Sequence, residues 1–252
     1  MSSREEMSVS FGAVAGAYES GRPDYPREAV EWMLAPVRQH DRALRVADVG
    51  AGTGKLTRTI VEAGADVVAI DPDPSMLAEL RQHVHGVPTF VGQAERMPLP
   101  DASLDAVLLG QAWHWVDVVA ASEEAGRVLR AGGVLGLVWN IRDETVPWIA
   151  ELTRVMHGSH AETMLADGDA QVAAPIGPLE EHRWEWTRTL GRSAFLDMVS
   201  SRSYIITASI QERTRILTAV GDLFDAQRRR DETGAEVVDI PYVTRAYRGI
   251  RS

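Results

Sequence analysis

Short apolar runs that alternate with amphipathic segments are the feature of this sequence that most restricts its fold. Continuous apolar, β-branched character predicts strands buried on both faces, and five such runs are Leu44–Gly50, Ala65–Ile70, Pro88–Gly92, Leu104–Gly110 and Gly133–Asn140. Apolar residues at helical spacing predict helices between and before them, at Leu56–Ala63, Pro74–Val84, Val116–Arg130 and Pro26–Val37. Strands that alternate with helices predict an α/β fold with a doubly wound, Rossmann-like parallel sheet.

The pattern changes after the fifth predicted strand. We expect residues 142–180 to be irregular, because Asp167–Pro178 is rich in Gly, Pro and Ala. Beyond them, alternation predicts strands at His182–Leu190 and Glu236–Tyr247, and helical spacing predicts helices near Ser193–Ser201 and Ile210–Arg229. The whole therefore predicts a seven-stranded mixed sheet whose last two strands are antiparallel, with helices on both faces.

Composition excludes several classes of function. The formal net charge of −10 disfavours nucleic acid as a partner, because such binders need a basic surface. The absence of cysteine excludes disulfides, thiolate catalysis and cysteine–zinc sites. His157 and His160 have no evident third ligand, so no metal is expected. The first residues contain no apolar core of a signal peptide, and no apolar run is long enough for a membrane helix, so we expect a cytoplasmic protein without membrane contact.

A glycine loop, "DVGAGTGKLT" (Asp48–Thr57), joins the first predicted strand to the next helix. Such a loop lets the backbone approach a ligand, and the helix N-terminus favours a negative group. A phosphate-binding P-loop would need glycine where Val49 stands, and the dinucleotide fingerprint would need it at Lys55. The spacing G-x-G-x-G remains.

An acidic residue ends the second predicted strand. Asp71, in "AIDPDP", stands where a carboxylate can accept hydrogen bonds from a ribose diol. The alternative is a plain tight turn with a helix-capping aspartate. The order strand, glycine turn, helix, strand and acid favours a nucleoside-containing cofactor.

Four segments occur in an order that resembles a known family. "ADVGAGTGKLT", "AIDPDPSML", "VGQAERMPLPDASLDAV" and "EAGRVLRAGGVL" resemble the successive motifs of class I S-adenosylmethionine-dependent methyltransferases, between Val46 and Trp139. "FGAVAGAYESGRPDYP" (Phe11–Pro26) and "AWHWVD" are similar to the trans-aconitate methyltransferase-like group of small-molecule enzymes. The resemblance implies S-adenosylmethionine as cofactor. It also implies a helical lid over residues 1–40 and one domain over 41–252, with a cofactor-binding half (41–141) and a substrate-side half (142–252) that ends in a β-hairpin.

The same resemblance implies a set of cofactor-binding residues. Gly50 and Gly52 would pass close to the methionine part, Asp48 would orient a water or the amino group, and Asp71 would hold the ribose. Gln93 stands where the family usually has an aspartate that contacts adenine, and its amide oxygen can accept the same hydrogen bond. The implied set is Asp48, Gly50, Ala51, Gly52, Asp71, Pro72, Met76, Gln93, Ala94 and Gln111.

The acceptor side is expected at the end of the fourth strand and in the N-terminal segment. His114 is a base, a hydrogen bonder that orients the acceptor, or a structural histidine at a helix entry. Arg22 either clamps a carboxylate of substrate or cofactor or forms a surface ion pair. The aromatic residues expected to line the substrate pocket, with core packing or lid packing as the alternative, are Tyr18, Tyr25, Trp113, Trp115 and Trp139.

The acceptor expected from these residues is a carboxylate or hydroxyl oxygen of a small molecule. The segment "GQAW" lacks the [N/D]-P-P-[Y/F] motif by which enzymes of this fold that methylate the exocyclic amines of nucleic-acid bases resemble one another. One alternative is a catalytically silent S-adenosylmethionine-binding or scaffold protein. Another is a nicotinamide dehydrogenase, which Lys55 disfavours.

Overall fold

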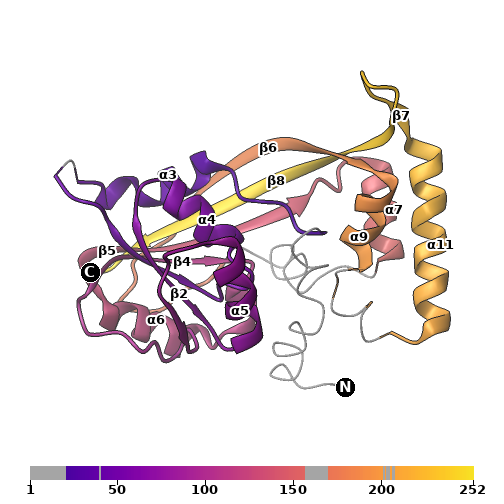
Figure 1. Ribbon diagram of the computed structural model, residues 1–252. Helices are drawn as coiled ribbons and strands as arrows, with labels where there is room; N and C mark the ends of the chain where they lie inside the picture. Colours follow the sequence, from indigo (N-terminus) through magenta and orange to yellow (C-terminus); the bar gives the residue numbers. More distant parts are fainter. Residues whose placement is uncertain (1–20, 40, 157–169, 201, 203–204, 206–207) are drawn as a thin grey trace.

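The computed structural model describes residues 21–39, 41–156, 170–200, 202, 205 and 208–252. Its sheet has the strand order β3-β2-β1-β4-β5-β8-β6, and the short β7 pairs with β8 as an eighth strand. β1 to β5 are parallel, whereas β8 is antiparallel to both β5 and β6. The predicted Rossmann-like mixed sheet is confirmed (Figure 1). The strands are β1 (Arg45–Val49), β2 (Asp66–Asp71), β3 (Thr89–Val91), β4 (Leu104–Gly110), β5 (Leu129–Arg142), β6 (Glu180–Gly191), β7 (Arg229–Arg230) and β8 (Glu236–Ile250).

Successive residues of the central strands are buried on opposite faces of the sheet, as the continuous apolar runs predict. Val46 packs in a cluster with α3 (Arg27–Leu34) and α4 (Lys55–Glu62), while its neighbour Ala47 packs in the cluster that holds α6 (Val118–Val128). On the face of α3 and α4, α5 (Pro74–His83) covers Ala69 of β2. Helices therefore cover both faces, as expected.

Within the segment predicted to be irregular, the structure has a helix, α7 (Pro147–Val155). Pro147 occupies the first helical turn, where its missing N–H leaves no bond unmade. Ile149 and Leu152, three residues apart, are fully buried. The expectation of irregular structure was wrong here. The stretch of sequence with helical spacing of apolar residues is only about two turns long, and a region rich in glycine and proline lies beyond it.

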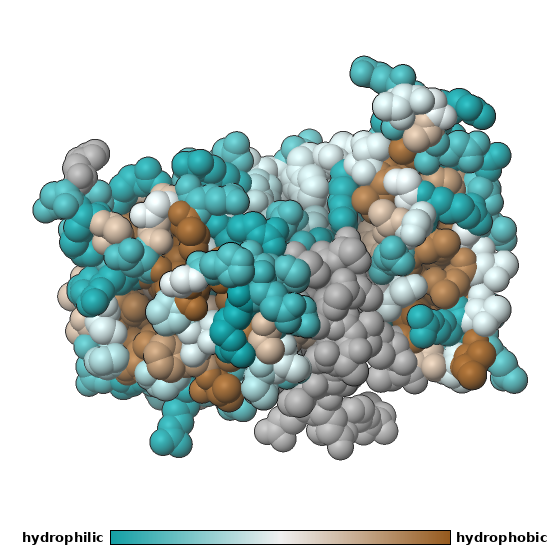
Figure 2. All heavy atoms as spheres, in the orientation of Figure 1, coloured by the Kyte–Doolittle hydropathy of each residue, from teal (hydrophilic) through white to brown (hydrophobic). Residues whose placement is uncertain are grey.

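α7 belongs to a second hydrophobic core. It packs with α9 (Arg192–Ser200), α11 (Ile210–Gln227) and one end of β6 and β8, and we call this unit the helical lobe. Phe195, Val220 and Phe224 lie at its centre. Figure 1 shows the helical lobe at the far end of the long strands from α3, α4, α5 and α6, and Figure 2 shows hydrophilic side chains around scattered apolar patches on both parts.

β8 takes part in both cores. Ala246, towards its C-terminal end, packs with α3 and α4, whereas Val238 and Ile240 pack in the helical lobe. β6 and β8 are antiparallel neighbours, but the segment carrying α9 and α11 joins them in place of a tight hairpin turn. The sheet thus continues from one core into the other.

The predicted N-terminal lid is only partly described. α3 is part of the helical layer, since Ala29, Val30 and Met33 are fully buried against the sheet. Before it, residues 21–25 form a short segment that we call the strap. Residues 1–20, with Tyr18, lie outside the described residues, as do His157 and His160. No helix among the residues that the structure describes is long and apolar enough to cross a membrane.

Candidate active site

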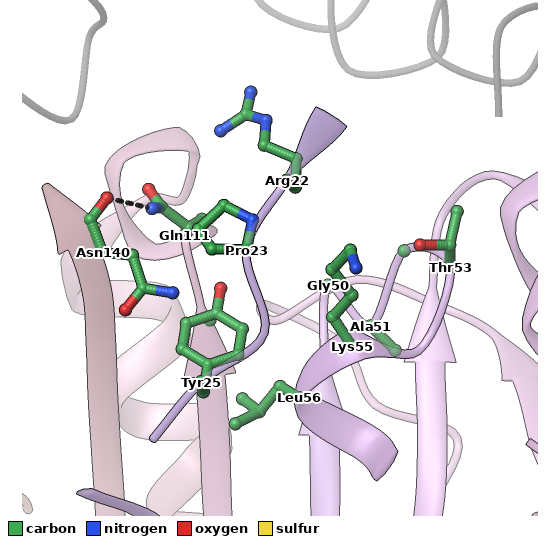
Figure 3. Close-up of a pocket in the computed structure, with 12 residues that line it drawn as sticks. Arg22, Pro23, Tyr25, Gly50, Ala51, Thr53, Lys55, Leu56, Gln111 and Asn140 are labelled. Atoms are coloured by element: carbon green, nitrogen blue, oxygen red, sulfur yellow. Dashed lines mark hydrogen bonds between the residues drawn. The ribbon is translucent and has the colours of Figure 1, made fainter. Parts of the chain in front are cut away.

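A pocket lies at the carboxyl ends of β1, β4 and β5, beneath the strap (Figure 3). This first pocket opens to solvent. Ligands of doubly wound sheets bind at these strand ends, so its place agrees with the expectation from the sequence. Its walls are Arg22, Pro23, Tyr25, Gly50, Ala51, Gly52, Thr53, Lys55, Leu56, Gly110, Gln111 and Asn140.

The glycine loop forms one wall of the first pocket. Gly50 and Gly52 have φ of +69° and +54°, a region that glycine adopts without strain. A Cβ on Gly50 would stand 2.6 Å from the Cβ of Ala112, whereas a Cβ on Gly52 would meet no atom within 4 Å. Gly50 is therefore required by packing, and Gly52 faces open space that a ligand can fill.

Asp71 ties the end of β2 to this loop. Its Oδ2 accepts a hydrogen bond from the Gly52 amide at 2.8 Å, and its Oδ1 accepts one from the Asp73 amide at 2.8 Å. Burial raises the pKa of Asp71 to about 6, although both amide hydrogen bonds act to lower it. The sequence indicated a ribose acceptor at Asp71; the bond to Gly52 was missed because it depends on how β1 and β2 are paired.

Asp48 is fully buried at the end of β1. The Thr57 hydroxyl donates to its Oδ2 at 2.5 Å, while its Oδ1 has no hydrogen-bond partner among the residues that the structure describes. Burial raises the pKa of this carboxyl to about 7. A buried acceptor with unused capacity beside a glycine loop suits a ligand that carries an N–H donor or a cationic amino group.

A second pocket begins directly after Asp71. Its walls are Pro72, Val91, Gly92, Gln93, Arg96, Met97, Pro98, Leu99 and Pro100. Largely apolar walls with one carboxamide suit a flat ring that carries an amino group. Gly52 lines the first pocket and Pro72, which follows Asp71, lines the second, so the Asp71–Gly52 hydrogen bond connects their walls. That the methionine, ribose and adenine parts of S-adenosylmethionine bind here in this order stays a prediction.

α6 holds the loop that walls the second pocket. Glu124 accepts a hydrogen bond from the Met97 amide at 2.6 Å, and Arg127 donates to the carbonyl oxygens of Met97 and Leu99. Arg127 also pairs with Glu124, whose pKa this contact lowers. Ala94 and Met76, expected at the cofactor, are both buried and line neither described pocket.

Gln111 and the strap form the other wall of the first pocket. Gln111 follows β4 with φ of +55°, and its Nε2 donates to the carbonyl oxygen of Asn140 at 2.8 Å. A non-glycine residue in this region is strained, and such strain is found most often at functional sites. Figure 3 shows Arg22 and Gln111 at the upper rim of the first pocket, with Tyr25 below them.

The tryptophans are placed differently from the expectation. Trp113 is buried and donates its indole N–H to the Gln171 carbonyl at 2.8 Å, and Trp139 is fully buried. Neither of these two side chains lines a described pocket. Both pack in the hydrophobic core, which is the alternative to a pocket position. Trp115 is half-buried against the ring of His114, 4.9 Å away.

His114 also lies outside the walls of both described pockets. Its Nδ1 accepts a long hydrogen bond of 3.4 Å from the indole N–H of Trp139. This contact favours the tautomer with the proton on Nε2. A role for His114 as a base stays a prediction.

The fold and this pair of pockets define a class I S-adenosylmethionine-dependent methyltransferase, and the chain belongs to that family. A methyltransferase domain model matches residues 47–137. An uncharacterized methyltransferase of Mycobacterium bovis is 46% identical over 247 residues, which cover 96% of each chain. S-adenosylmethionine is the cofactor of this family. The narrower likeness to the trans-aconitate group is not confirmed.

Two further comparisons bear on parts of the chain. A malonyl-[acyl-carrier protein] O-methyltransferase of Methylococcus capsulatus is 39% identical over 134 residues, which cover 50% of this chain and 48% of that protein. A solved structure from Anaeromyxobacter dehalogenans, described as a type II methyltransferase, superposes with a TM-score of 0.62 at 23% identity and covers 91% of this chain and 97% of its own. The second likeness concerns the fold alone.

Proposed function

We propose that this methyltransferase acts on an oxygen of a small molecule, with a carboxylate as first choice and a hydroxyl as second. The observation that carries the proposal is the charge of the first pocket. Its charged walls, among the residues that the structure describes, are Arg22 and Lys55, of which Lys55 pairs with Asp24 at 3.2 Å, and no histidine, aspartate or glutamate lines it. A carboxylate nucleophile needs no base, whereas a hydroxyl does.

When bound, S-adenosylmethionine supplies a methyl group on a positively charged sulfur. The residues of this chain then have to orient the acceptor and exclude water. Arg22 can bind a carboxylate through two parallel N–H···O bonds, which orients it. Tyr25 packs against Gly110, where a Cβ would stand 2.7 Å from the Tyr25 oxygen, so the ring closes one side of the pocket.

The comparisons support an enzyme over a catalytically silent binding protein. The Mycobacterium bovis protein that covers nearly the whole chain is described as a methyltransferase. The Methylococcus capsulatus relative is an O-methyltransferase, and its overlap with this chain is about half of each. The net charge of −10 opposes a polyanionic acceptor, which supports a small molecule over nucleic acid.

The test is transfer of labelled methyl from S-adenosylmethionine to a panel of small carboxylates, phenols, alcohols and amines. We expect alkali-labile methyl esters from the carboxylates. Transfer only to amines or carbon would contradict the proposal, and no transfer by a protein that still binds S-adenosylhomocysteine would favour the silent alternative.

Arg22 variants test which carboxylate this residue binds. We expect Arg22→Gln to raise KM for the acceptor about tenfold or more, since hydrogen bonds to charged groups contribute about 1.5–3 kcal/mol. The Kd for S-adenosylhomocysteine should stay unchanged, and Arg22→Lys should recover part of the loss. An equal loss of S-adenosylhomocysteine affinity would assign Arg22 to the methionine carboxylate of the cofactor instead.

A further inference from the structure

Three side chains form a hydrogen-bonded chain that runs from the helical lobe to the strap. The indole N–H of Trp186 on β6 donates to the Thr244 hydroxyl on β8 at 2.8 Å. That hydroxyl donates to Oδ1 of Asn140 on β5 at 2.7 Å. Nδ2 of Asn140 then donates to the carbonyl oxygen of Asp24 at 3.1 Å. The chain therefore crosses three neighbouring strands and ends on the strap.

The direction of this chain is set by chemistry. An indole N–H can only donate, so the Thr244 oxygen must accept from Trp186. The single proton of the hydroxyl is then left for Oδ1 of Asn140. With Oδ1 used in this way, the NH₂ group of Asn140 faces the strap, where a carbonyl oxygen receives it. A reversed amide would place two oxygens opposite each other.

The chain is buried and branches at Asn140. Thr244 is fully buried and Asn140 nearly so, and the Asn140 carbonyl also accepts the bond from Gln111. A buried polar group that loses its hydrogen-bond partner destabilises the folded state by its full desolvation free energy. Asn140 thus holds two walls of the first pocket at once, the strap through its side chain and Gln111 through its backbone.

The other end of the chain rests on the helical lobe. The ring of Trp186 stacks on Tyr242 with centroids 4.8 Å apart and planes at 13°, and Tyr242 is part of the lobe core. β6 holds the strap at a second point, since Arg188 donates to the Gly21 carbonyl at 2.9 Å. The strap is therefore positioned from the lobe side, while Lys55 contacts Asp24 from α4.

We propose that Thr244 and Asn140 are positioning residues for methyl transfer: they transmit the packing of the helical lobe to the strap and so fix where Arg22 and Tyr25 stand in the first pocket. The proposal rests on the family's cofactor and not on the identity of the acceptor. Thr244 does not line the described pockets, so its substitution can affect ligand binding only through its neighbours, of which Asn140 bonds the strap directly.

The first experiment is titration of Thr244→Val with S-adenosylhomocysteine. Valine has nearly the same shape but leaves the indole N–H of Trp186 and Oδ1 of Asn140 each without a partner. We expect about a tenfold rise in Kd, because Tyr25 and Gln111, which line the first pocket, then lose their fixed positions. Thr244→Ser restores the hydroxyl and should bind like the parent. Thr189→Val is the matched control, because it removes another hydroxyl bond between β6 and β8, that of Thr189 to Asp239, which does not lead to the strap.

A second readout follows the strap itself. The chain has no cysteine, so a spin label on Asp24→Cys reports one position, and its main-chain carbonyl is kept. We expect the label to become more mobile with Thr244→Val and to be unchanged with Thr244→Ser and Thr189→Val. Asn140→Asp, which keeps the acceptor for Thr244 but turns an oxygen towards the Asp24 carbonyl, should mobilise it as well.

The outcomes separate positioning from mere stability. A lower melting temperature of Thr244→Val with unchanged Kd and unchanged label mobility would overturn the proposal, because the chain would then only stabilise the fold. If Thr244→Val does not fold, Asn140→Asp decides in the same way through its label mobility. A rise in Kd that Thr244→Ser does not reverse would also count against it.

Discussion

The carboxylate of Asp71 and the amide of Gly52 are joined by a hydrogen bond of 2.8 Å between the end of β2 and the glycine loop. One side chain therefore shapes the loop and is also the acceptor that the sequence predicts for the ribose of the cofactor. The two tasks are compatible because each carboxylate oxygen can accept more than one hydrogen bond. The contact also explains why the acid and the glycines occur together.

Substitution of Asp71 should weaken cofactor binding strongly. We expect Asp71→Ala to raise the Kd for S-adenosylhomocysteine about a hundredfold, because bonds to a charged acceptor are lost. Asp73→Ala is the control: it removes the cap on the Ser75 amide and should lower stability by about 1 kcal/mol with little change in Kd. Calorimetric titration measures the Kd of each variant, and equal affinities for the two would refute the role of Asp71.

The two glycines of the loop should respond differently to alanine. Gly50→Ala places a Cβ 2.6 Å from that of Ala112 at positive φ, so we expect a loss of about 3 kcal/mol in the free energy of unfolding. Gly52→Ala meets no neighbour and should lose only about 1 kcal/mol, yet weaken S-adenosylhomocysteine binding. Urea unfolding and titration separate the two effects. Similar stabilities for both variants would contradict the packing argument.

Asp48 should make the ligand-free protein less stable as pH rises. Its pKa is raised from 3.8 to about 7 by burial, so between pH 4 and 7 the folded state keeps a proton that the unfolded chain releases. The native state then binds more protons, and stability falls with increasing pH in this window. Asp71, with its pKa raised to about 6, contributes with the same sign up to about pH 6.

The check is the free energy of unfolding at pH 5 and pH 8 for the parent and for Asp48→Asn. Asparagine does not titrate, so we expect it to reduce the fall between these values by an amount on the order of 2 kcal/mol. Asp105, whose pKa is lowered by Arg42 and Arg130, acts with the opposite sign at lower pH. An identical pH dependence for parent and variant would rule out Asp48 as its source.

His114 should be dispensable for chemistry if the acceptor is a carboxylate. A general base contributes about 10²- to 10⁴-fold, so His114→Gln with kcat within about threefold of the parent would exclude that role. The measurement is kcat against pH with the best carboxylate acceptor. A hundredfold fall, together with unchanged S-adenosylhomocysteine binding, would establish His114 as a base and favour a hydroxyl acceptor.

The strands of the sheet could be predicted from the sequence because burial on both faces leaves continuous apolar runs such as Leu104–Gly110, found as β4. The glycine loop and Asp71 follow from local spacing in the same way. The direction in which a side chain points does not follow from local spacing. The indole N–H of Trp113 reaches a carbonyl 58 residues away, and whether that ring faces pocket or core depends on packing between distant segments.

The chain from Trp186 to Asn140 was also beyond prediction. Thr244 and Asn140 are 104 residues apart, and their contact depends on the register of β8 against β5. No local pattern encodes such a pairing. The pairing of Asn140 with Thr244 is itself one rung of that antiparallel register.

The passage of β8 through both cores limits how this enzyme can move. Domain closure by a hinge needs a few backbone positions that can change conformation freely, but β8 is bonded to β5 and β6 on either side along the boundary between the cores. The two cores are therefore joined by continuous hydrogen-bonded strands and not by a flexible linker. Access for substrate and release of product then depend on segments that are not part of the sheet.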